Sequence, residues 1–379
     1  MGKNLLVVHG GAPTAVMNAS LYGVLTEAKR HGEIDRVLAA RAGTAGILKG
    51  DLIDLTDLPQ AKIDLLPGTP ATVIGTSRTP LRAEHYGQMC EAFVRSNVGY
   101  VLFNGGNGTM DACGKARAAC ETAGLDVRVV GIPKTIDNDI AVTDHAPGFG
   151  SAARYLAATV GEVVEDVRAL PIHVCIVEAM GRNAGWLCAA SALAGDAGQG
   201  PDMILLPEVP FEEEAFLARV EQLHARQGGV VVVASEGLRD PCGAPVVKPV
   251  FQIGRSVYFG DVGAHLAELV IRRLGVKARS EKPGICGRAS IAHQSPVDRE
   301  EAAACGREAV RLAAQGASGV MVTLSHTGEL GKAAIEDVML RERKLPGHFV
   351  SADGYGVTPA YLDWARPLIG GPLPAFLTL

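Results

Sequence analysis

The chain has 379 residues, 47% hydrophobic and 20% charged, which predicts a globular protein with two domains. Its net charge of −5 and the lack of a basic block argue against nucleic acid or an anionic membrane as a partner, and no apolar run reaches the roughly 18 residues of a membrane span. The eight cysteines form no CxxC pair and no signal-peptide pattern opens the chain, so we expect reduced thiols and a cytoplasmic protein.

Short apolar runs alternate along the chain with longer segments whose apolar residues recur every three or four positions. The short runs are typical of strands that are buried on both faces, and the longer segments are typical of amphipathic helices. The predicted strands are Leu5–Val8, Tyr100–Phe103, Val127–Ile132, His173–Val177, Met203–Leu206, Val230–Ala234 and Gly319–Leu324. The predicted helices are Ala19–Arg30, Met110–Ala123, Ser151–Ala169 and Phe211–Gln227. This alternation predicts α/β layers with right-handed crossovers.

Most glycine-rich and polar motifs follow directly after a predicted strand. They are His9-Gly10-Gly11, Asn104–Thr109, Pro133–Asp139, Met180–Trp186 and Ser235-Glu236-Gly237. In open α/β sheets, ligands bind beyond the carboxyl ends of the strands. Turns of this kind after so many strands therefore predict a ligand site that is built from several loops.

The segment YVLFNGGNGTMDACGKA predicts a strand, a glycine turn and a helix in direct succession. Gly105, Gly106 and Gly108 permit positive φ and close approach of a ligand to the backbone. A helix that begins near Met110 would point its free N–H groups into the turn, as helix N-termini that hold phosphate do. Neither GxxxxGK[ST] nor GxGxxG is present. A plain strand–helix turn capped by Thr109 is the alternative.

The segment VVGIPKTIDNDI places two carboxylates, a lysine and a hydroxyl on one short turn. These residues are Lys134, Thr135, Asp137 and Asp139, with Asn138 between the carboxylates. Phosphoryl transfer needs a carboxylate that accepts the proton of the attacking hydroxyl and a cation that neutralises the transferred group. A second carboxylate suits Mg²⁺. The alternative is a surface turn rich in turn-forming residues, which the apolar strand leading into it disfavours.

Together these motifs resemble the phosphofructokinase family. NGGNGT resembles its GGDGS/T turn, PKTIDND its P[GK]TIDND loop, and EAMGRNAGW its E-x-MGR-x-x-G segment. GGAPTAVMNAS resembles the N-terminal glycine loop of the family, and IGTSR, which ends at Arg78, resembles the arginine-bearing segment that follows it. TDHAPGFGSAARY and ASALAGDAGQGPDMILLPEVPF resemble a longer bacterial subgroup that includes pyrophosphate-dependent members.

The resemblance implies two three-layer α/β domains with mostly parallel sheets and an active site in the cleft between them. Residues 1–149 with about 288–342 would form a phosphoryl-donor domain, and about 150–287 with 343–379 a sugar-phosphate domain. The implied reaction moves a phosphoryl group from ATP or pyrophosphate to the C1 hydroxyl of fructose 6-phosphate, with Mg²⁺ as cofactor. One acceptor arginine of the family normally comes from a neighbouring subunit, which implies a homodimer or homotetramer.

The resemblance also implies a role for individual residues. Asp137 would be the base, with Thr135 beside it, while Arg78 and Arg182 would stabilise charge on the transferring group. The donor would contact Gly11, Gly106, Asn107, Gly108, Thr109 and Lys134. The sugar phosphate would contact Thr135, Asp137, Met180, Gly181, Arg182, Glu236, Arg279, Arg288 and His173. Asn107 and Asp139 would hold Mg²⁺.

Departures from the family pattern leave the donor open. Asn107 replaces an aspartate that usually helps to bind Mg²⁺, and its neutral oxygen is a weaker ligand. Gly108 stands where an aspartate of the family occupies the space of a nucleotide's α-phosphate, whereas Lys134 is typical of pyrophosphate users. Two negative charges at short range repel each other by several kcal/mol. We therefore weight the open space at Gly108 above the lysine and favour ATP, with pyrophosphate as the alternative.

The acceptor is open as well. His173 stands where the family usually has an arginine on the 6-phosphate, Ile285 where many members have histidine, and Gly287 where a glutamine precedes the second arginine. The acceptor is fructose 6-phosphate, another sugar phosphate or a polyol, so a pyrophosphate-dependent kinase of one of the latter is one alternative. A non-catalytic sugar-phosphate sensor is another, which the intact Thr135–Asp139 run and Arg182 disfavour.

Overall fold

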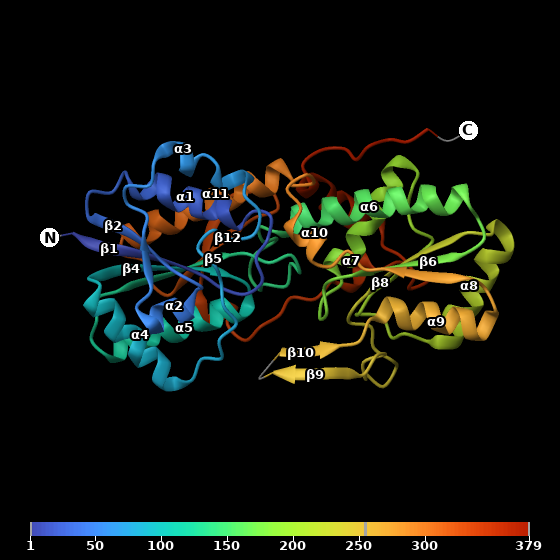
Figure 1. Cartoon of the computed structure of the whole chain (residues 1–379), viewed down its shortest axis with the longest axis horizontal. Coiled ribbons are helices and arrows are strands. Elements are labelled where there is room, and N and C mark those ends of the chain that lie inside the picture. Colours follow the sequence, from blue (N-terminus) through green and yellow to red (C-terminus); the bar gives the residue numbers. More distant parts are fainter. Residues whose placement is uncertain (1, 254–255, 378–379) are drawn as a thin grey trace. The chain divides into compact units, whose positions relative to one another are not determined.

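The computed structural model describes residues 2–253 and 256–377 (Figure 1). Its internal contacts divide the chain into two compact units. Unit 1 consists of Met1–Ile136, Ile140–Ser151 and Arg288–Arg343. Unit 2 consists of Asp137–Asp139, Ala152–Gly287 and Lys344–Leu379. Each unit has its own sheet and its own apolar core, and their assignment to donor and sugar phosphate stays a prediction.

Unit 1 is built on a seven-stranded sheet with the strand order β13-β12-β5-β4-β1-β2-β3. The central strands are parallel, and the edge strands β3 and β13 run antiparallel to their neighbours. The strands are β1 (Lys3–His9), β2 (Ile34–Ala40), β3 (Leu52–Asp54), β4 (Val98–Gly105), β5 (Arg128–Pro133), β12 (Val320–Leu324) and β13 (Leu330–Ala334). The carboxyl ends of β1, β4 and β5 therefore meet at one edge of the sheet.

Helices cover both faces of this sheet (Figure 1). They are α1 (Met17–Ala28), α2 (Thr44–Lys49), α3 (Gln60–Ile63), α4 (Ala83–Arg95), α5 (Asn107–Thr122), α11 (Pro296–Ala314) and α12 (Ile335–Val338). Successive residues of β1 point to opposite faces. Leu5 and Val7 join the core beneath α1 and α11, whereas Leu6 and Val8 join the core beneath α4 and α5. Apolar residues on both faces of β1 thus produce three layers.

Helices α1 and α11 approach each other closely at two glycines. A Cβ atom added at Gly23 would lie 2.0 Å from the carbonyl oxygen of Ala303, and one at Gly306 would lie 2.1 Å from that of Ser20. Neither distance is compatible with a side chain, because the neighbouring atoms belong to backbone. The two helices therefore pack backbone against backbone at this crossing.

Unit 2 has a four-stranded parallel sheet with the order β11-β6-β8-β7 and a separate antiparallel ribbon, β9 with β10. The strands are β6 (Val174–Ala179), β7 (Met203–Leu205), β8 (Val230–Ser235), β9 (Pro249–Ile253), β10 (Ser256–Phe259) and β11 (Ala278–Glu281). The helices are α6 (Phe149–Ala169), α7 (Trp186–Ala190), α8 (Glu213–Gln227), α9 (Val262–Leu274), α10 (Ile285–Ala289) and α13 (Pro359–Ala365), of which the start of α6 and the end of α10 belong to unit 1. Helices α8 and α9 cover one face of the parallel sheet and α6 the other (Figure 1).

An aromatic cluster fastens the last part of the chain to unit 2. Trp186 packs against Trp364 and Phe349, with ring centroids 4.7 Å and 5.9 Å away. The hydroxyl of the buried Tyr361 donates to the carbonyl oxygen of Trp186 at 2.6 Å. These contacts place α13 against α7, directly after the MGRNAG motif.

The predicted alternation of strands and helices is confirmed, and the sheets are mostly parallel. The predicted helix near Met110 begins earlier, at Asn107. Strands β2, β3, β9, β10, β11 and β13 were not predicted. Short or polar strands such as Ala278–Glu281 have no apolar run that could identify them in the sequence. They form because they pair with a neighbouring strand.

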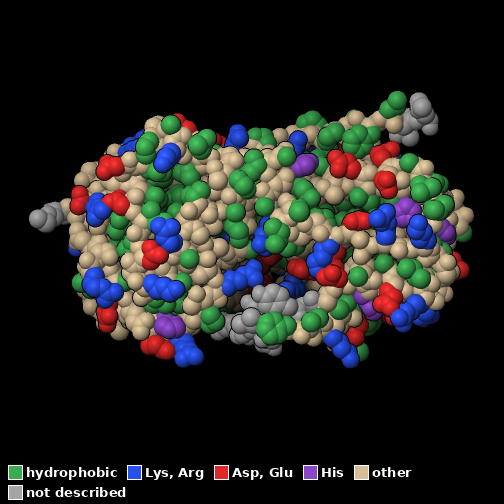
Figure 2. Space-filling model, in the orientation of Figure 1, with side chains coloured by type: hydrophobic (Ala, Val, Ile, Leu, Met, Phe, Trp, Pro, Cys, Tyr) green, Lys and Arg blue, Asp and Glu red, His purple; other side chains and the backbone are tan. Residues whose placement is uncertain are grey.

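Charged side chains of both signs are interspersed on the surface that Figure 2 shows. Among the described residues, no helix combines the length and the hydropathy that a membrane span needs.

Candidate active site

The glycine loop after β1 is tied to the end of β5 by Lys134. Its ammonium group donates to the carbonyl oxygens of Gly10 at 3.2 Å and Ala12 at 2.6 Å, and the residue is 3% exposed. Gly11 has a φ of 74°, in the left-handed region, and a Cβ there would lie 3.7 Å from the Lys134 nitrogen. The lysine thus places a buried positive charge directly beneath the loop.

The segment that carries Arg78 lies beside the same loop. Ser77 forms a parallel bridge with Gly10, and the Thr76 hydroxyl donates to the carbonyl oxygen of Gly11 at 2.8 Å. Arg78 itself is exposed. Backbone pairing therefore brings two motifs that are far apart in the sequence to one place in unit 1.

The glycine turn after β4 leads directly into α5, with Gly106 as its N-cap. Thr109 lies inside the first turn and its N–H donates to the carbonyl oxygen of Gly106 at 2.8 Å, so the cap at Thr109 that the alternative interpretation assumed is not present. The Thr109 hydroxyl oxygen lies only 2.3 Å from where a Cβ at Gly10 would be, and 2.2 Å from one at Gly105. Both positions need glycine because the threonine fills the space.

Asn107 and Gly108 form the beginning of α5, where backbone N–H groups have no partner within the helix. The aligned peptide dipoles favour an anion at this end. Gly108 is exposed, and a Cβ there would meet no atom within 4 Å. The turn therefore has the chemistry of a phosphate site, with free space beside its second residue.

The loop after β5 begins at Thr135, which is buried and rests on a second loop. Its N–H donates to the carbonyl oxygen of Pro147 at 3.1 Å, and it forms a parallel bridge with Gly148. Two residues on, the buried Asn138 has a φ of 52°, a conformation that asparagine tolerates better than most residues. Asp137 and Asp139 flank it and are half-buried.

In unit 2, the loops after β6 and β8 are joined by hydrogen bonds. The Ser235 hydroxyl donates to the carbonyl oxygen of Gly181 at 2.8 Å, and the Glu236 N–H donates to that of Ala179 at 2.9 Å. A Cβ at Gly237 would lie 1.7 Å from the carbonyl oxygen of Arg182. Met180–Arg182 and Glu236, separated in the sequence, therefore meet at the carboxyl ends of these strands.

Burial raises the pKa of Glu236, and the Glu178 carboxylate adds to this effect. The Arg182 guanidinium opposes both. Glu178 is itself buried and forms an ion pair with Lys282 at 2.7 Å. The predicted sugar-binding pair of Arg182 and Glu236 is therefore part of a larger group of charges within unit 2.

Two predicted acceptor residues lie at the opposite end of the same sheet. His173 precedes β6, and Arg279 of β11 pairs with Cys175 at the start of β6, whereas Met180 follows the end of β6. At a rise of about 3.3 Å per residue, Met180 is about 23 Å along the chain from His173 and about 17 Å from Cys175, the pairing partner of Arg279. The predicted acceptor residues are therefore divided between the two ends of this sheet.

Arg288 lies on α10, as do Ile285 and Gly287, two positions that depart from the family pattern. Ile285 is 64% exposed. A Cβ at Gly287 would lie 3.2 Å from the ring of Tyr155. The tyrosine ring thus occupies the space that a side chain at position 287 would need.

The Phosphofructokinase family matches residues 4–313. The chain belongs to the phosphofructokinase family. The pyrophosphate–fructose 6-phosphate 1-phosphotransferase of Xanthomonas campestris pv. campestris is 38% identical to it, over 98% of this chain and 92% of the relative. The sulfofructose kinase of Alkalicoccus urumqiensis is 32% identical, over 96% of this chain and 95% of the relative.

A solved phosphofructokinase structure has the same fold. The pyrophosphate-dependent phosphofructokinase of Nitrosospira multiformis superposes with a TM-score of 0.90 at 34% identity, over 99% of this chain and 94% of the other. The predicted family and the two-domain fold are thereby confirmed.

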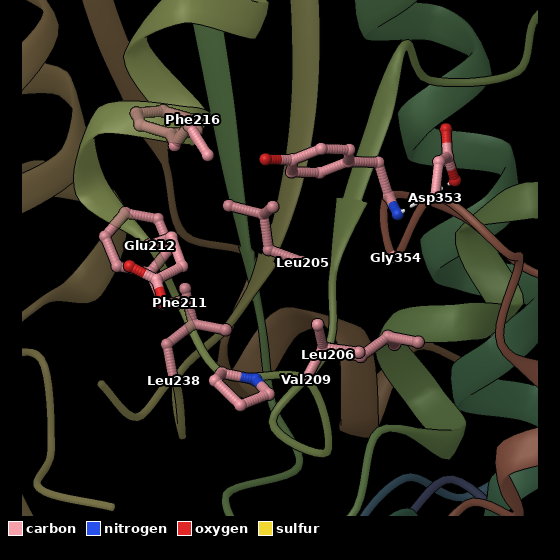
Figure 3. A pocket seen from close by; sticks show the side chains of 12 residues that line it. Leu205, Leu206, Val209, Phe211, Glu212, Phe216, Leu238, Asp353 and Gly354 are labelled. Carbon is pink, nitrogen blue, oxygen red and sulfur yellow. Dashed lines mark hydrogen bonds between the residues drawn. The ribbon is translucent and has the colours of Figure 1, made fainter. Parts of the chain in front are cut away.

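The cavity that Figure 3 shows is lined by none of the residues that are predicted to bind the donor or the sugar phosphate. It has a volume of about 180 Å³, lies within unit 2 next to the end of β7, and is mainly apolar. Phe211, Phe216 and Leu238 line it, with Glu212 and Asp353 nearby. It is therefore separate from the loops that carry the predicted chemistry.

The described residues contain no cluster of three or more His, Cys, Asp or Glu side chains that could hold a metal ion by themselves. Mg²⁺ takes oxygen ligands, keeps several waters and often binds through one or two carboxylates and substrate phosphates. The amide oxygen of Asn107 and the carboxylate of Asp139 fit such a ligand set in chemical type.

Asp298 is a buried carboxylate that the sequence motifs did not single out. It is 2% exposed, and burial raises its pKa to about 6 although three hydrogen bonds from Gly148 and Ser151 oppose this. A sequence signal was present. The S-x-x-D pattern of Ser295 and Asp298 is a sequence signature of a helix start, and Ser295 does cap α11 by accepting from the Asp298 N–H. The reciprocal bond of a capping box is not formed, because the Ser295 N–H donates to the Ser151 hydroxyl.

Proposed function

We propose that this phosphofructokinase transfers a phosphoryl group from pyrophosphate to the C1 hydroxyl of fructose 6-phosphate. The observation that carries the proposal is the buried Lys134 ammonium beneath the glycine loop, next to the turn that leads into the N-terminus of α5. The similarity of the whole chain to a pyrophosphate–fructose 6-phosphate 1-phosphotransferase supports it further.

The choice of pyrophosphate reverses the preference for ATP that Gly108 suggested. Pyrophosphate presents only phosphate charge, and Lys134, Arg78 and the first turn of α5 offer cations and N–H donors without an adenosine site. ATP remains a second candidate because Gly108 is exposed and no atom lies within 4 Å of where its Cβ would be. An α-phosphate therefore meets neither a side chain nor a negative charge there.

In the proposed reaction, the C1 oxygen forms a bond to a phosphorus atom of pyrophosphate as the bridging P–O bond breaks and phosphate leaves. The Asp137 carboxylate accepts the proton of the C1 hydroxyl, and Thr135 orients the two groups. Arg78 and Arg182 neutralise the oxygens of the transferring group. Mg²⁺, held by Asn107, Asp139 and the donor phosphates, would supply further charge neutralisation.

The sugar would lie against Met180, Gly181, Arg182 and Glu236. Gly11, Gly106 and Thr109 would shape the backbone around the donor. Arg288 would bind the distal phosphate of the sugar. His173 and Arg279 lie about 23 Å and about 17 Å from Met180 along the strand, so we propose that they serve the site of a neighbouring copy in a homo-oligomer.

A different acceptor is a second candidate. His173 is 4% exposed, and among the described residues neither of its ring nitrogens has a hydrogen-bond partner. An imidazole in place of an arginine offers less positive charge, which suits a singly charged sulfonate better than a phosphate dianion. The similarity to a sulfofructose kinase adds weight to this acceptor.

An activity matrix of donors and acceptors tests the proposal. Purified protein with Mg²⁺ receives pyrophosphate or ATP, each with fructose 6-phosphate, a sulfonated fructose or unphosphorylated sugars and polyols. We expect the highest kcat/KM with pyrophosphate and fructose 6-phosphate, and loss of activity when the metal is chelated. Binding of sugar phosphates without any phosphoryl transfer would contradict the proposal and favour a sensor.

A further inference from the structure

We propose that Asp298 is a positioning residue of the phosphoryl-transfer site. It fixes the loop of residues 143–148, on which Thr135 rests. The inference depends on the proposed function in one respect, because Thr135 is assigned to the reaction there. Its structural part, that Asp298 holds Thr135 in place, stands on contacts within unit 1.

The Asp298 carboxylate is surrounded by hydrogen-bond donors. One oxygen accepts from the Gly148 N–H at 2.8 Å, and the other accepts from the N–H and the hydroxyl of Ser151, at 2.8 Å and 2.5 Å. The Ser151 hydroxyl in turn accepts from the Ser295 N–H at 3.1 Å. The carboxylate therefore satisfies the first turn of α6 although it belongs to α11.

The contact with Gly148 reaches Thr135 directly. Gly148 is the bridge partner of Thr135 and has a φ of 110°, which glycine adopts without strain. A Cβ added at Gly148 would lie 3.0 Å from the carbonyl oxygen of Thr135 and 3.0 Å from the Thr14 methyl group. Because these backbones are so close, a displacement of Gly148 displaces Thr135.

A second acid on α11 holds the other end of the same loop. Glu301, one helical turn after Asp298, lies 2.9 Å from the Nε2 atom of His145. The loop is also tied to β12, because the Leu324 N–H donates to the Thr143 hydroxyl at 2.9 Å. Helix α11 thus anchors both His145 and Gly148, and Asp298 is the anchor nearer to Thr135.

Only a group without donors suits the position of Asp298. Two N–H groups and a hydroxyl point at its oxygens, so an asparagine would turn its NH₂ group toward one of these donors. A buried carboxylate is costly unless it is fully hydrogen-bonded. Its presence in unit 1 is therefore explained by the loop that it organises rather than by packing.

The test compares Asp298→Asn with a control variant at another contact of α11. Glu27→Gln, on α1, removes the charge and one acceptor oxygen of the buried Glu27, which accepts from Arg311 of α11 at 2.9 Å and 3.2 Å, away from the loop. Each variant is measured by steady-state kinetics, thermal unfolding and amide hydrogen exchange. We expect Asp298→Asn to lower kcat at least tenfold with KM for both substrates within threefold, and to accelerate exchange at Thr135. Glu27→Gln should lose stability but keep kcat within twofold.

Folded Asp298→Asn protein with a kcat within twofold of wild type and unchanged exchange at Thr135 would overturn the inference. If this variant does not fold, Gly148→Ala replaces it, because the added Cβ pushes on the Thr135 carbonyl. Wild-type turnover in Gly148→Ala would overturn the inference as well. Faster exchange at Thr135 in an enzyme that does not use the proposed substrates would support the positioning role and reject the proposed function alone.

Discussion

The donor region and the acceptor region of this phosphofructokinase differ in how far a single chain completes them. In unit 1, Lys134, Gly11 and the first turn of α5 are joined by backbone pairing and by hydrogen bonds within the unit. In unit 2, the predicted acceptor residues are divided between the two ends of one sheet. A phosphate turn depends on local backbone, whereas the acceptor site as proposed draws residues from two copies of the chain.

The base provides the largest expected effect. Asp137→Ala removes the group that accepts the proton of the C1 hydroxyl, and general-base catalysis is worth about a thousandfold in rate. We expect kcat to fall by about that factor, while circular dichroism and thermal unfolding stay close to wild type. Asp139→Ala is the matched control, and restoring its activity with excess Mg²⁺ would separate metal binding from proton transfer. Wild-type turnover in Asp137→Ala would reject the proposed mechanism.

The division of the acceptor residues predicts complementation between copies. Arg182→Ala and Arg279→Ala should each lower kcat/KM for the sugar phosphate about a hundredfold. Co-expressed with different tags, the two variants should form mixed oligomers with one intact site, which gives about a quarter of wild-type activity for random dimers. Mixed oligomers without any recovery would show that Arg279 does not serve a neighbouring copy.

The loop of residues 143–148 in unit 1 has a pH-dependent contact at His145. Burial alone would lower the pKa of His145, but hydrogen bonds with Asp144 and Glu301 outweigh it and raise the pKa to about 9 from 6.5. The folded-state pKa exceeds the unfolded one, so the stabilisation is fully present below pH 6.5 and is lost as the pH rises through about 9.

Urea unfolding measures this contact. Between pH 6 and pH 9.5, we expect the free energy of unfolding to fall by about 2 kcal/mol more in the wild type than in His145→Gln. The exposed His348 supplies a control, since His348→Gln should keep the pH dependence of the wild type. Equal slopes in the wild type and His145→Gln would show that the histidine is not charged in the folded protein.

The smallest expected effect concerns the choice of donor. Gly108→Asp adds a carboxylate where the structure has free space, so the helix should tolerate it. Repulsion of an α-phosphate should weaken the binding of ATP about tenfold, whether ATP is measured as a donor or as an inhibitor. The kcat/KM with pyrophosphate should change less than threefold, and Gly108→Ala should leave both donors unaffected. Unchanged ATP affinity would mean that no nucleotide phosphate lies near this residue.

Local signals predicted much of the fold. Apolar runs such as Val230–Ala234 identified the buried parallel strands, and the glycine turn identified α5, although its start was misplaced because Thr109 packs into the turn instead of capping the helix. The separation of His173 from Met180 could also be predicted, since His173 begins a predicted strand and Met180 comes after the end of that strand.

Long-range contacts could not be predicted in this way. Asp298 and Gly148 are 150 positions apart, and nothing in either segment indicates the other. Edge strands such as β11 carry polar residues, so only their hydrogen bonds to β6 define them. The part of the site that rests on local backbone could be read from the sequence, and the part that rests on such pairings could not.

The crossing of α1 and α11 at Gly23 and Gly306 has a consequence for motion in unit 1. Helix α1 follows the glycine loop, and α11 carries Asp298, which holds the loop of residues 143–148. Both loops are therefore attached to one closely packed pair of helices. With backbone against backbone, neither helix can slide or rotate without the other. A substrate that moves one loop must therefore tilt this pair as a rigid body and move the other loop with it.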